Sequence, residues 1–291
     1  MKSSGNTSIG IFGNPHKKDI VKLLSLIIGQ LNKNGIKYLI DSGLKKQIES
    51  FKKIKTVRHA EIIKHSDIIF SLGGDGTFLN TARIVGRKNI PILGINLGRL
   101  GFFSEIGPGG IKNFIPELIK GRYKIKEQTI IEAEINRKQF YCLNDIVIDK
   151  SESIRMIETI TYYNSEKVFR CLSDGIIVST PAGSTGYSMS CNGPVVNPKS
   201  SVLIITPISP HTLNVRPIII PDDGEIVVKL PLAGKARITA DGQKTVSFKT
   251  PLEVKMHKAD YTIKVVKKLN STYFNTLTKK LLWNVDRRTN S

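Results

Sequence analysis

The sequence contains few cysteines, and their spacing is unlike that of a metal site. Only Cys142, Cys171 and Cys191 occur among the 291 residues. An odd number of widely separated thiols predicts neither a disulfide framework nor a zinc-binding motif. We therefore expect three free thiols and a reducing, cytoplasmic location.

Long apolar runs are missing as well. No stretch approaches the ~20 apolar residues that a membrane-spanning helix requires. Residues 1–6 lack the apolar segment of a secretory signal peptide. We expect no membrane partner.

Acidic residues are scarce relative to basic ones. The chain has 24 Asp and Glu against 44 Lys and Arg, which gives a formal net charge of +20 and a pI near 9.8. Such an excess attracts polyanions, including nucleic acid and nucleotides. The cations are mostly lysines spread along the chain, however, and no zinc-finger, basic-zipper or RNA-binding signature accompanies them. The charge has two interpretations, a nucleic-acid surface or AT-rich coding bias. The second is favoured, and we expect no specific nucleic-acid partner.

The most informative stretch is a glycine-rich turn between a strand and a helix. In residues 67–70, Asp67 is followed by three apolar residues, of which Ile68 and Ile69 are β-branched, and this run predicts a short buried strand. Residues 78–85 have apolar side chains at helical spacing and end at Gly86. The turn between them can bring backbone N–H groups close to a phosphate, and the helix N-terminus favours negative charge. The predicted phosphate-binding residues are Gly73, Gly74, Gly76 and Thr77.

Asp75 lies in the middle of this turn, where a carboxylate would repel a phosphate. Two functional explanations remain open, proton acceptance from a hydroxyl that attacks a phosphate and coordination of Mg²⁺ between phosphates. The structural alternative is that Asp75 only caps the following helix.

The chain changes character near residue 123. Strands and helices alternate before it, which predicts a doubly wound, Rossmann-like parallel sheet. The first predicted helix follows Asp19 and has an apolar stripe on one face, formed by Ile20, Leu23, Leu24, Ile27 and Leu31. Short strand-like runs and turn clusters follow as far as residue 268, which predicts a β-rich domain. Asp241-Gly242-Gln243 predicts a hairpin turn within it. We expect an α/β domain over residues 1–122, a β-rich domain over residues 123–270, and a C-terminal helix and tail over residues 271–291 that packs back on the first domain. The terminal helix should have an apolar side formed by Phe274, Leu277, Leu281 and Leu282.

Polar loops of the second half suit a sugar or a base. Residues 180–190 are rich in small hydroxyl side chains and include Tyr187, which could stack on a ring. Asn144-Asp145 and Asp174 could accept hydrogen bonds from ribose hydroxyls. Ordinary turn chemistry is the alternative for each of these sites. His211 is a possible base, but without a paired nucleophile or carboxylate a structural role is favoured.

Taken together, these segments resemble the NAD kinase family, in particular its bacterial members. The similar segments are Gly73 to Thr77, Asn96 to Phe102, Asn144-Asp145, Ser173 to Gly175, Thr180 to Ser190, Pro207 to Pro217, Asp241 to Gln243 and Tyr273 to Trp283. They occur in the order typical of the family and span nearly the whole chain. The glycine turn alone is also found in phosphofructokinases and diacylglycerol-type lipid kinases, so the serine-threonine loop is the more specific feature.

The resemblance implies phosphorylation of the adenosine 2′-hydroxyl of NAD by ATP, which gives NADP. It implies a divalent metal ion, Mg²⁺, bound mainly through the nucleotide, so no residue is assigned as a metal ligand. It also implies a homo-oligomer, either a dimer or a tetramer.

The resemblance further assigns roles to individual residues. Asp75 matches the proton acceptor of the family. The positions implied to bind NAD are Asp75, Gly76, Asn144, Asp145, Arg155, Asp174, Ala182, Thr185, Gly186, Tyr187, Ser188, Met189, Ser190 and Gln243. Ala182 and Gly186 differ from the residues common there, threonine and alanine, and Leu172 stands where some members have a basic residue.

Two other functions compete with this one. A related kinase that acts on a lipid or a sugar phosphate would not turn over NAD. A nucleic-acid or nucleotide-binding protein without catalysis would bind DNA with a steep salt dependence and would be indifferent to substitution of Asp75.

Overall fold

The computed structural model describes residues 7–49, 54–98, 101–151, 153–212 and 214–283. By their internal contacts the residues form two compact units, unit 1 with residues 1–127 and 263–291 and unit 2 with residues 128–262. These units are defined by contacts, and the three domain ranges expected from the sequence, 1–122, 123–270 and 271–291, stay a prediction.

Unit 1 is built on a parallel sheet in the order β3-β2-β1-β4-β5. Neighbouring strands pair in the registers Ile11↔Ile40, Ile11↔Phe70 and Ser71↔Gly94. The strands are β1 (Ser8–Gly13), β2 (Lys37–Asp41), β3 (Thr56–Val57), β4 (Ile68–Leu72) and β5 (Ile92–Ile95). Two further segments, β6 (Ser104–Ile106) and the end of β16 (Lys244–Lys267), pair with β5.

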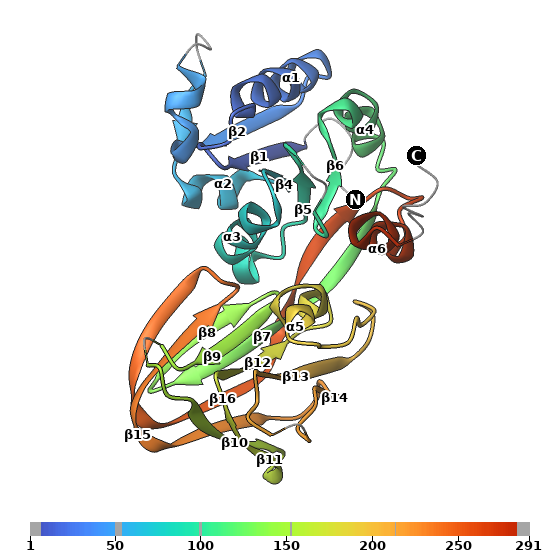
Figure 1. The fold of residues 1–291 in the computed structure, drawn as a ribbon. Helices are drawn as coiled ribbons and strands as arrows, with labels where there is room; N and C mark the ends of the chain where they lie inside the picture. The colour runs from blue at the N-terminus through green and yellow to red at the C-terminus, as the bar shows by residue number, and fades with distance from the viewer. Residues whose placement is uncertain (1–6, 50–53, 99–100, 152, 213, 284–291) are drawn as a thin grey trace, which may run out of the picture. The chain divides into compact units, whose positions relative to one another are not determined.

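Helices cover both faces of this sheet (Figure 1). They are α1 (Ile20–Lys33), α2 (His59–His65), α3 (Asp75–Val85) and α4 (Ile111–Ile119). The apolar stripe predicted for α1 is confirmed, because Leu23, Leu24, Ile27 and Leu31 are all buried. These side chains join a core with β1 residues Ile9 and Ile11 and with α4, so α1 and α4 share one face.

The other face of the sheet is covered by α2 and α3. Gly10 lies between Ile9 and Ile11 and therefore points to this face. A Cβ at Gly10 would lie 2.3 Å from Ile62 Cγ2 of α2. Glycine at this position thus lets α2 approach the sheet closely.

The strand order reverses between β1 and β4. From β1 the chain continues outward through β2 to β3, whereas β4 continues in the opposite direction to β5. Ligands bind at such a switch point, in the crevice at the carboxyl ends of the strands. β4 ends at Leu72, so the glycine turn lies at this edge of unit 1.

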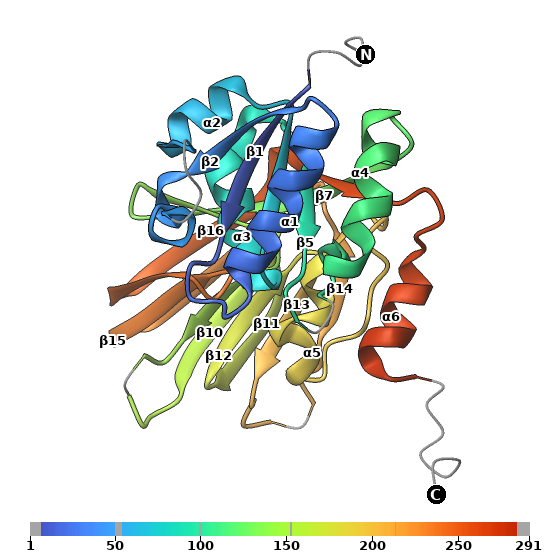
Figure 2. The same cartoon turned by 90° about the horizontal axis from the view of Figure 1, so that it is seen from above.

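The C-terminal segment completes unit 1. After β16, helix α6 spans Tyr273–Leu281 and begins at Thr272, whose side chain accepts a hydrogen bond from the Asn275 N–H group. The apolar side expected for this helix is only partly buried, since Leu277 is buried whereas Phe274 and Leu282 are exposed. Figure 2 shows α4 and α6 from above.

Unit 2 consists mainly of antiparallel strands. A central series runs β14-β13-β12-β9-β15-β16. The strands are β7 (Lys124–Ile135), β8 (Lys138–Cys142), β9 (Asp145–Asp149), β10 (Ile157–Tyr163), β11 (Glu166–Ser173), β12 (Gly175–Ser179), β13 (Val202–Ile208), β14 (Ile218–Pro221) and β15 (Ile226–Ala240), together with most of β16. The core is formed by alternating side chains of these strands, such as Ile146 and Ile148 of β9, and by Phe140.

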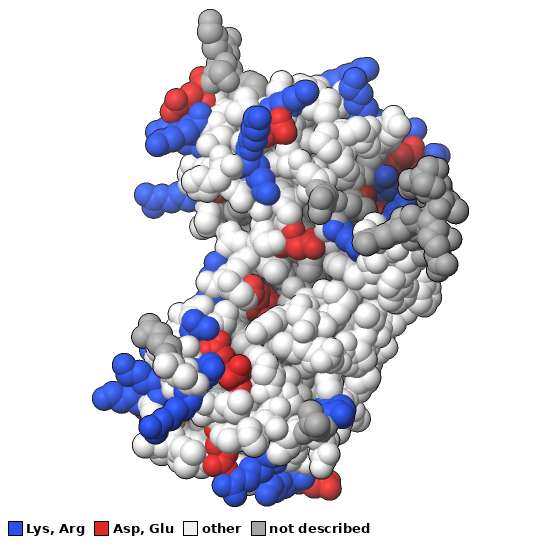
Figure 3. Space-filling view, in the orientation of Figure 1, with Lys and Arg blue, Asp and Glu red and all other residues white. Residues whose placement is uncertain are grey.

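The predicted fold class is confirmed, with an α/β sheet in unit 1, a β-rich unit 2 and a terminal helix. None of the helices in the described ranges is long and apolar enough to cross a membrane. On the face drawn in Figure 3, Lys and Arg side chains form several separate groups with Asp and Glu among them.

Candidate active site

The glycine turn connects β4 to α3 through a tight backbone approach. A Cβ at Gly73 would lie 2.3 Å from Thr77 Oγ1, so only glycine fits there. The Gly73 N–H group donates to the Ile95 carbonyl at 2.9 Å, and the Thr77 N–H group donates to the Gly74 carbonyl at 3.0 Å. Both N–H groups thus have partners within unit 1, and the phosphate contacts of Gly73 and Thr77 stay a prediction.

Asp75 is the first residue of α3, and its side chain does not cap the helix. The N-cap is Gly74, with no side-chain cap hydrogen bond. Asp75 Oδ2 instead accepts from the Phe102 N–H group at 2.8 Å, and Oδ1 accepts from the Phe103 N–H group at 3.1 Å. The helix-cap interpretation of Asp75 is thus wrong, and the carboxylate is held by a loop 27 residues further along the chain.

The loop that holds Asp75 needs a glycine of its own. A Cβ at Gly101 would lie 1.8 Å from Asp75 Oδ1. Phe103 is also stacked on Phe78 of α3, with ring centroids 4.8 Å apart and planes inclined by 4°. The same helix therefore provides both the carboxylate and an aromatic ring that fixes the loop.

In unit 2, the ends of three neighbouring strands meet around Asp145. This residue begins β9, and it pairs with Ser179 at the end of β12. On the other side of β9, Ala240 at the end of β15 pairs with Ile146, and the Asp241 N–H group donates to the Asp145 carbonyl at 3.0 Å. The two antiparallel neighbours thus bring loops from distant parts of the sequence to one edge.

Asp241 holds the turn that contains Asn144 and Asp145. Its carboxylate accepts from the N–H groups of Leu143 at 2.9 Å, Asn144 at 2.7 Å and Asp145 at 3.3 Å. Asp241 and Gly242 have φ values of 52° and 63° in the predicted hairpin turn between β15 and β16. The sequence indicated the turn from Asp-Gly, but nothing in it indicated that Asp241 binds a distant loop.

The serine-threonine loop packs on the same turn. Thr180 Oγ1 donates to the Leu143 carbonyl at 2.6 Å, and the Thr180 N–H group donates to the Asn144 carbonyl at 2.9 Å. A Cβ at Gly183 would lie 2.1 Å from the Asn144 carbonyl oxygen. The loop continues through two short helical turns, η5 (Ala182–Thr185) and α5 (Tyr187–Ser190).

A pocket of about 470 Å³ lies over these elements. Asp145 and Asp149, four residues apart on β9, line it on the same face of the strand. Arg237 of β15 makes a bidentate ion pair with Asp149, with Nε and Nη2 at 3.1 and 3.0 Å from the carboxylate. The full lining is Asn144, Asp145, Val147, Asp149, Gly186, Tyr187, Arg237, Thr239, Asp241, Gly242 and Thr245. Carboxylates and hydroxyls beside the ring of Tyr187 suit a hydroxylated ring.

Asp145 has an unusual protonation equilibrium. Burial and the nearby charge of Asp241 raise the pKa of its carboxyl group to about 7, and a hydrogen bond from the Tyr187 backbone opposes the shift. The neighbouring Asn144 Oδ1 is buried without a hydrogen-bond partner. An unsatisfied acceptor and a carboxyl group that can donate or accept are both suited to hydroxyl or amino groups of a ligand.

The structure brings some of the predicted NAD-binding residues to this pocket and places others elsewhere. Asn144, Asp145, Gly186 and Tyr187 line it, and Gln243 is exposed next to Gly242 of the lining. Ser188 is fully buried, and its hydroxyl is 2.8 Å from Thr206 Oγ1, so it supports the loop from inside.

Four more predicted residues lie around the loop without lining the pocket. Ala182 and Thr185 belong to η5, where Thr185 Oγ1 donates to the Ala182 carbonyl at 3.2 Å. Met189 and Ser190 end α5, and Ser190 is exposed.

The two remaining predicted residues of unit 2 also lie outside the pocket lining. Arg155 is exposed in the segment before β10. Asp174 precedes β12, and its carboxylate makes an ion pair with Lys150 Nζ at 2.8 Å. Among the predicted residues of unit 1, Gly76 is the second residue of α3.

Comparison with known proteins assigns the chain to a family. The model of the ATP-NAD kinase N-terminal domain matches residues 9–123, and that of the C-terminal domain matches residues 143–268. A NAD kinase of Bacteroides fragilis is 36% identical over 286 residues, covering 96% of this chain and 98% of that protein. The chain belongs to the NAD kinase family. It is therefore a kinase, as the sequence resemblance predicted.

A second NAD kinase and two solved structures are also similar to this chain. The NAD kinase of Christiangramia forsetii is 34% identical over 291 residues, covering 96% of this chain and 99% of its own. A crystal structure of a yeast NADH kinase with NADH has a TM-score of 0.90 at 23% identity, over 98% of this chain and 90% of that chain. An NAD kinase from Archaeoglobus fulgidus with ATP has a TM-score of 0.76 at 24% identity, over 95% and 99%. These two likenesses show that the fold is shared.

Proposed function

We propose that this NAD kinase family member transfers the γ-phosphoryl group of ATP to the 2′-hydroxyl of the adenosine ribose of NAD, giving NADP, with Asp75 as the proton acceptor. The observation that carries the proposal is the placement of Asp75. Its carboxylate lies at the N-terminus of α3 at the switch point of the sheet and is held by two backbone N–H groups. A carboxylate at this edge of the sheet is well placed to accept a proton from the hydroxyl group that receives the phosphoryl group.

In the proposed mechanism, Asp75 accepts a hydrogen bond from the 2′-hydroxyl and then its proton as the hydroxyl oxygen attacks the γ-phosphorus. The bond from the γ-phosphorus to the β,γ-bridging oxygen breaks, and ADP is the leaving group. Each carboxylate oxygen has about two lone pairs, and one N–H group occupies one position on each oxygen. Acceptor capacity therefore remains for the hydroxyl. The N-terminus of α3, at Gly74 and Gly76, contributes a favourable dipole for the phosphates of ATP. Phosphoryl transfer depends mainly on such positioning and charge stabilisation.

We further propose that the pocket of unit 2 binds the adenosine part of NAD. Asn144 and Asp145 offer acceptors for ribose or adenine groups, and Tyr187, which is 46% exposed, offers a ring for stacking. Arg155, Asp174, Ala182, Thr185, Met189, Ser190 and Gln243 remain proposed contacts from the family resemblance. Ser188, which is buried, supports the site from within.

Mg²⁺ is proposed to arrive on the triphosphate. In the described ranges, no group of at least three His, Cys, Asp or Glu side chains could hold a metal ion. The donor set therefore does not fit a resident ion held by the protein alone, and Mg²⁺ often binds mainly through substrate phosphates and water. No step of the mechanism is assigned to an ion held by protein ligands.

Cellular location and assembly complete the proposal. Cys142, Cys171 and Cys191 are all free thiols, which supports the proposed location in the cytoplasm, where thiols stay reduced.

We also propose a homo-oligomer, a dimer or a tetramer. Ile218 and Ile219 of β14 and Leu232 of β15 are exposed apolar residues that such an interface could cover.

The proposal is tested by incubating the purified protein with ATP, Mg²⁺ and NAD and measuring NADP enzymatically. Parallel reactions contain a diacylglycerol or a sugar phosphate in place of NAD. The proposal predicts phosphorylation of NAD alone. Turnover of the lipid or the sugar phosphate without NADP formation would instead support the related kinases.

A further inference from the structure

The peptide group between Phe102 and Phe103 makes hydrogen bonds in two opposite directions. Its N–H, from Phe103, donates to Asp75 Oδ1 at 3.1 Å, and its carbonyl, from Phe102, accepts from Lys267 Nζ at 3.3 Å. A cation at the carbonyl oxygen polarises the peptide group, and linked hydrogen bonds strengthen one another. The ammonium group of Lys267 is therefore connected to the Asp75 carboxylate through a single peptide group.

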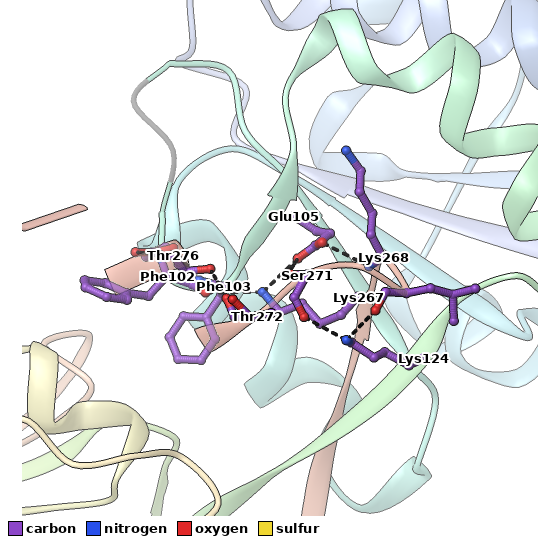
Figure 4. A network of polar contacts seen from close by, with 11 residues as sticks. Phe102, Phe103, Glu105, Lys124, Lys267, Lys268, Ser271, Thr272 and Thr276 are labelled. Atoms are coloured by element: carbon purple, nitrogen blue, oxygen red, sulfur yellow. Dashed lines mark hydrogen bonds and ion pairs between the residues drawn. The ribbon is translucent and has the colours of Figure 1, made fainter. Parts of the chain in front are cut away.

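Lys267 is itself held in place by Glu105. Its ammonium group lies 3.2 Å from Glu105 Oε2, and the two side chains are only 9% and 5% exposed. Glu105 also accepts from the Lys268 N–H group at 2.9 Å and from Ser271 Oγ at 3.2 Å, as Figure 4 shows. The ion pair is thus fixed in direction by hydrogen bonds from the C-terminal segment.

A buried ion pair of this kind needs an explanation other than stability. Removing two charges from water costs about as much free energy as their attraction returns, so an apolar pair is often at least as stable. The pair instead orients the Phe102–Phe103 peptide, because Lys267 holds the Phe102 carbonyl on the side of the peptide opposite Asp75. The stacking of Phe103 on Phe78 fixes the same peptide from the helix that bears Asp75.

We propose that Lys267, oriented by Glu105, is a positioning residue that sets the direction and hydrogen bonding of the Asp75 carboxylate. It acts through the Phe102–Phe103 peptide and touches neither substrate. The inference rests on the proposed role of Asp75 as proton acceptor. It predicts that loss of Lys267 lowers the rate of phosphoryl transfer and leaves the binding of both substrates nearly unchanged.

The primary variant is the double substitution Glu105→Gln with Lys267→Met, because removal of one partner alone leaves an unpaired buried charge. The single variant Lys267→Arg, made with Glu105 intact, keeps a cation at this position. Lys124→Met is the matched control, since Lys124 Nζ donates to the Leu269 and Ser271 carbonyls at 2.6 and 2.7 Å. It loosens the same C-terminal segment without contact to the peptide that holds Asp75.

Each of these proteins is made with and without the additional substitution Asp75→Asn, and kcat and KM are measured for NADP formation. With Asp75 present, the double variant should lose on the order of tenfold to 10²-fold in kcat, with KM values within about twofold, because a small misplacement at a reacting group carries such a cost. Lys267→Arg should recover part of the loss, and Lys124→Met should stay within about twofold of the original kcat. When Asp75→Asn is already present, the double variant should cost no further activity.

Equal loss with and without Asp75→Asn would overturn the inference, since it would show a general structural effect. Unchanged kcat in the folded double variant would overturn it as well. If the double variant does not fold by circular dichroism, Glu105→Gln with Lys267→Gln, which also leaves no unpaired buried charge, decides by the same comparison. Absence of NADP formation by the unmodified protein would instead reject the proposed function, and full activity of Asp75→Asn would reject the role of Asp75.

Discussion

Substitution of Asp145 by Asn is predicted to stabilise the protein at high pH. Asp145 is 6% exposed, and burial together with the charge of Asp241 raises its pKa from 3.8 to about 7. In the unfolded chain this carboxyl ionises at its ordinary pKa. The folded protein therefore binds the Asp145 proton more tightly than the unfolded chain does.

The sign and the size of the effect follow from this difference. Below a pH of about 4 both states are protonated and the group imposes no cost, whereas the free energy of unfolding falls as pH rises from about 4 through about 7. A carboxyl pKa raised from 3.8 to about 7 corresponds to about 4 kcal/mol once the group is ionised in both states. Asn has nearly the same shape and no charge, so Asp145→Asn should remove this pH-dependent loss.

Urea unfolding followed by circular dichroism at pH 5, 6, 7 and 8 measures the effect, and hydrogen exchange of β9 localises it. The gain of Asp145→Asn over the original protein should grow across this range, up to about 4 kcal/mol at pH 8. Glu166→Gln, at an exposed carboxylate of β11, is the control and should show no such trend. The reasoning would be refuted if the difference in unfolding free energy between Asp145→Asn and the original protein did not change with pH. It would also be refuted if that difference were smaller at pH 8 than at pH 5.

Two further predictions concern the loops that support the site. Gly101→Ala would place a Cβ 1.8 Å from Asp75 Oδ1 and should displace the carboxylate. In steady-state assays kcat should fall on the order of 10²-fold. Unchanged kcat would contradict this contact. Asp241→Ala leaves the N–H groups at residues 143–145 without their carboxylate and should cost at least about 2 kcal/mol in urea unfolding and raise KM for NAD more than for ATP. Asp241→Asn, which keeps one acceptor oxygen, should show a smaller loss; equal effects of both variants would argue against the hydrogen bonds as the cause.

The fold was predictable from the sequence where the signals are local. The stripe of α1, the glycine turn and the Asp-Gly hairpin each depend on residues a few positions apart, and each occurs as expected. Helix α6 was predicted in place, but Phe274 is 66% exposed. Apolar spacing indicates which residues share a side of a helix and does not indicate how much of that side is covered.

The site was less predictable because its hydrogen bonds join distant residues. Asp75 and Phe102 are 27 positions apart, and Asp241 and Asn144 are 97 apart. These contacts arise from the pairing of β5 with β6 and of β9 with β15, and sequence alone indicated neither pairing. Residue type could therefore identify Asp75, Asn144 and Asp145 as candidates, but it could not distinguish a helix cap from a carboxylate held by a second loop.

The most direct test of the central claim is the rate of NADP formation by Asp75→Asn with saturating ATP, Mg²⁺ and NAD. Base catalysis by a positioned carboxylate contributes on the order of 10²–10⁴ in rate. The variant is therefore predicted to lose activity by about that factor while it keeps its circular dichroism spectrum. A folded variant with near-normal turnover would show that Asp75 does not accept the proton.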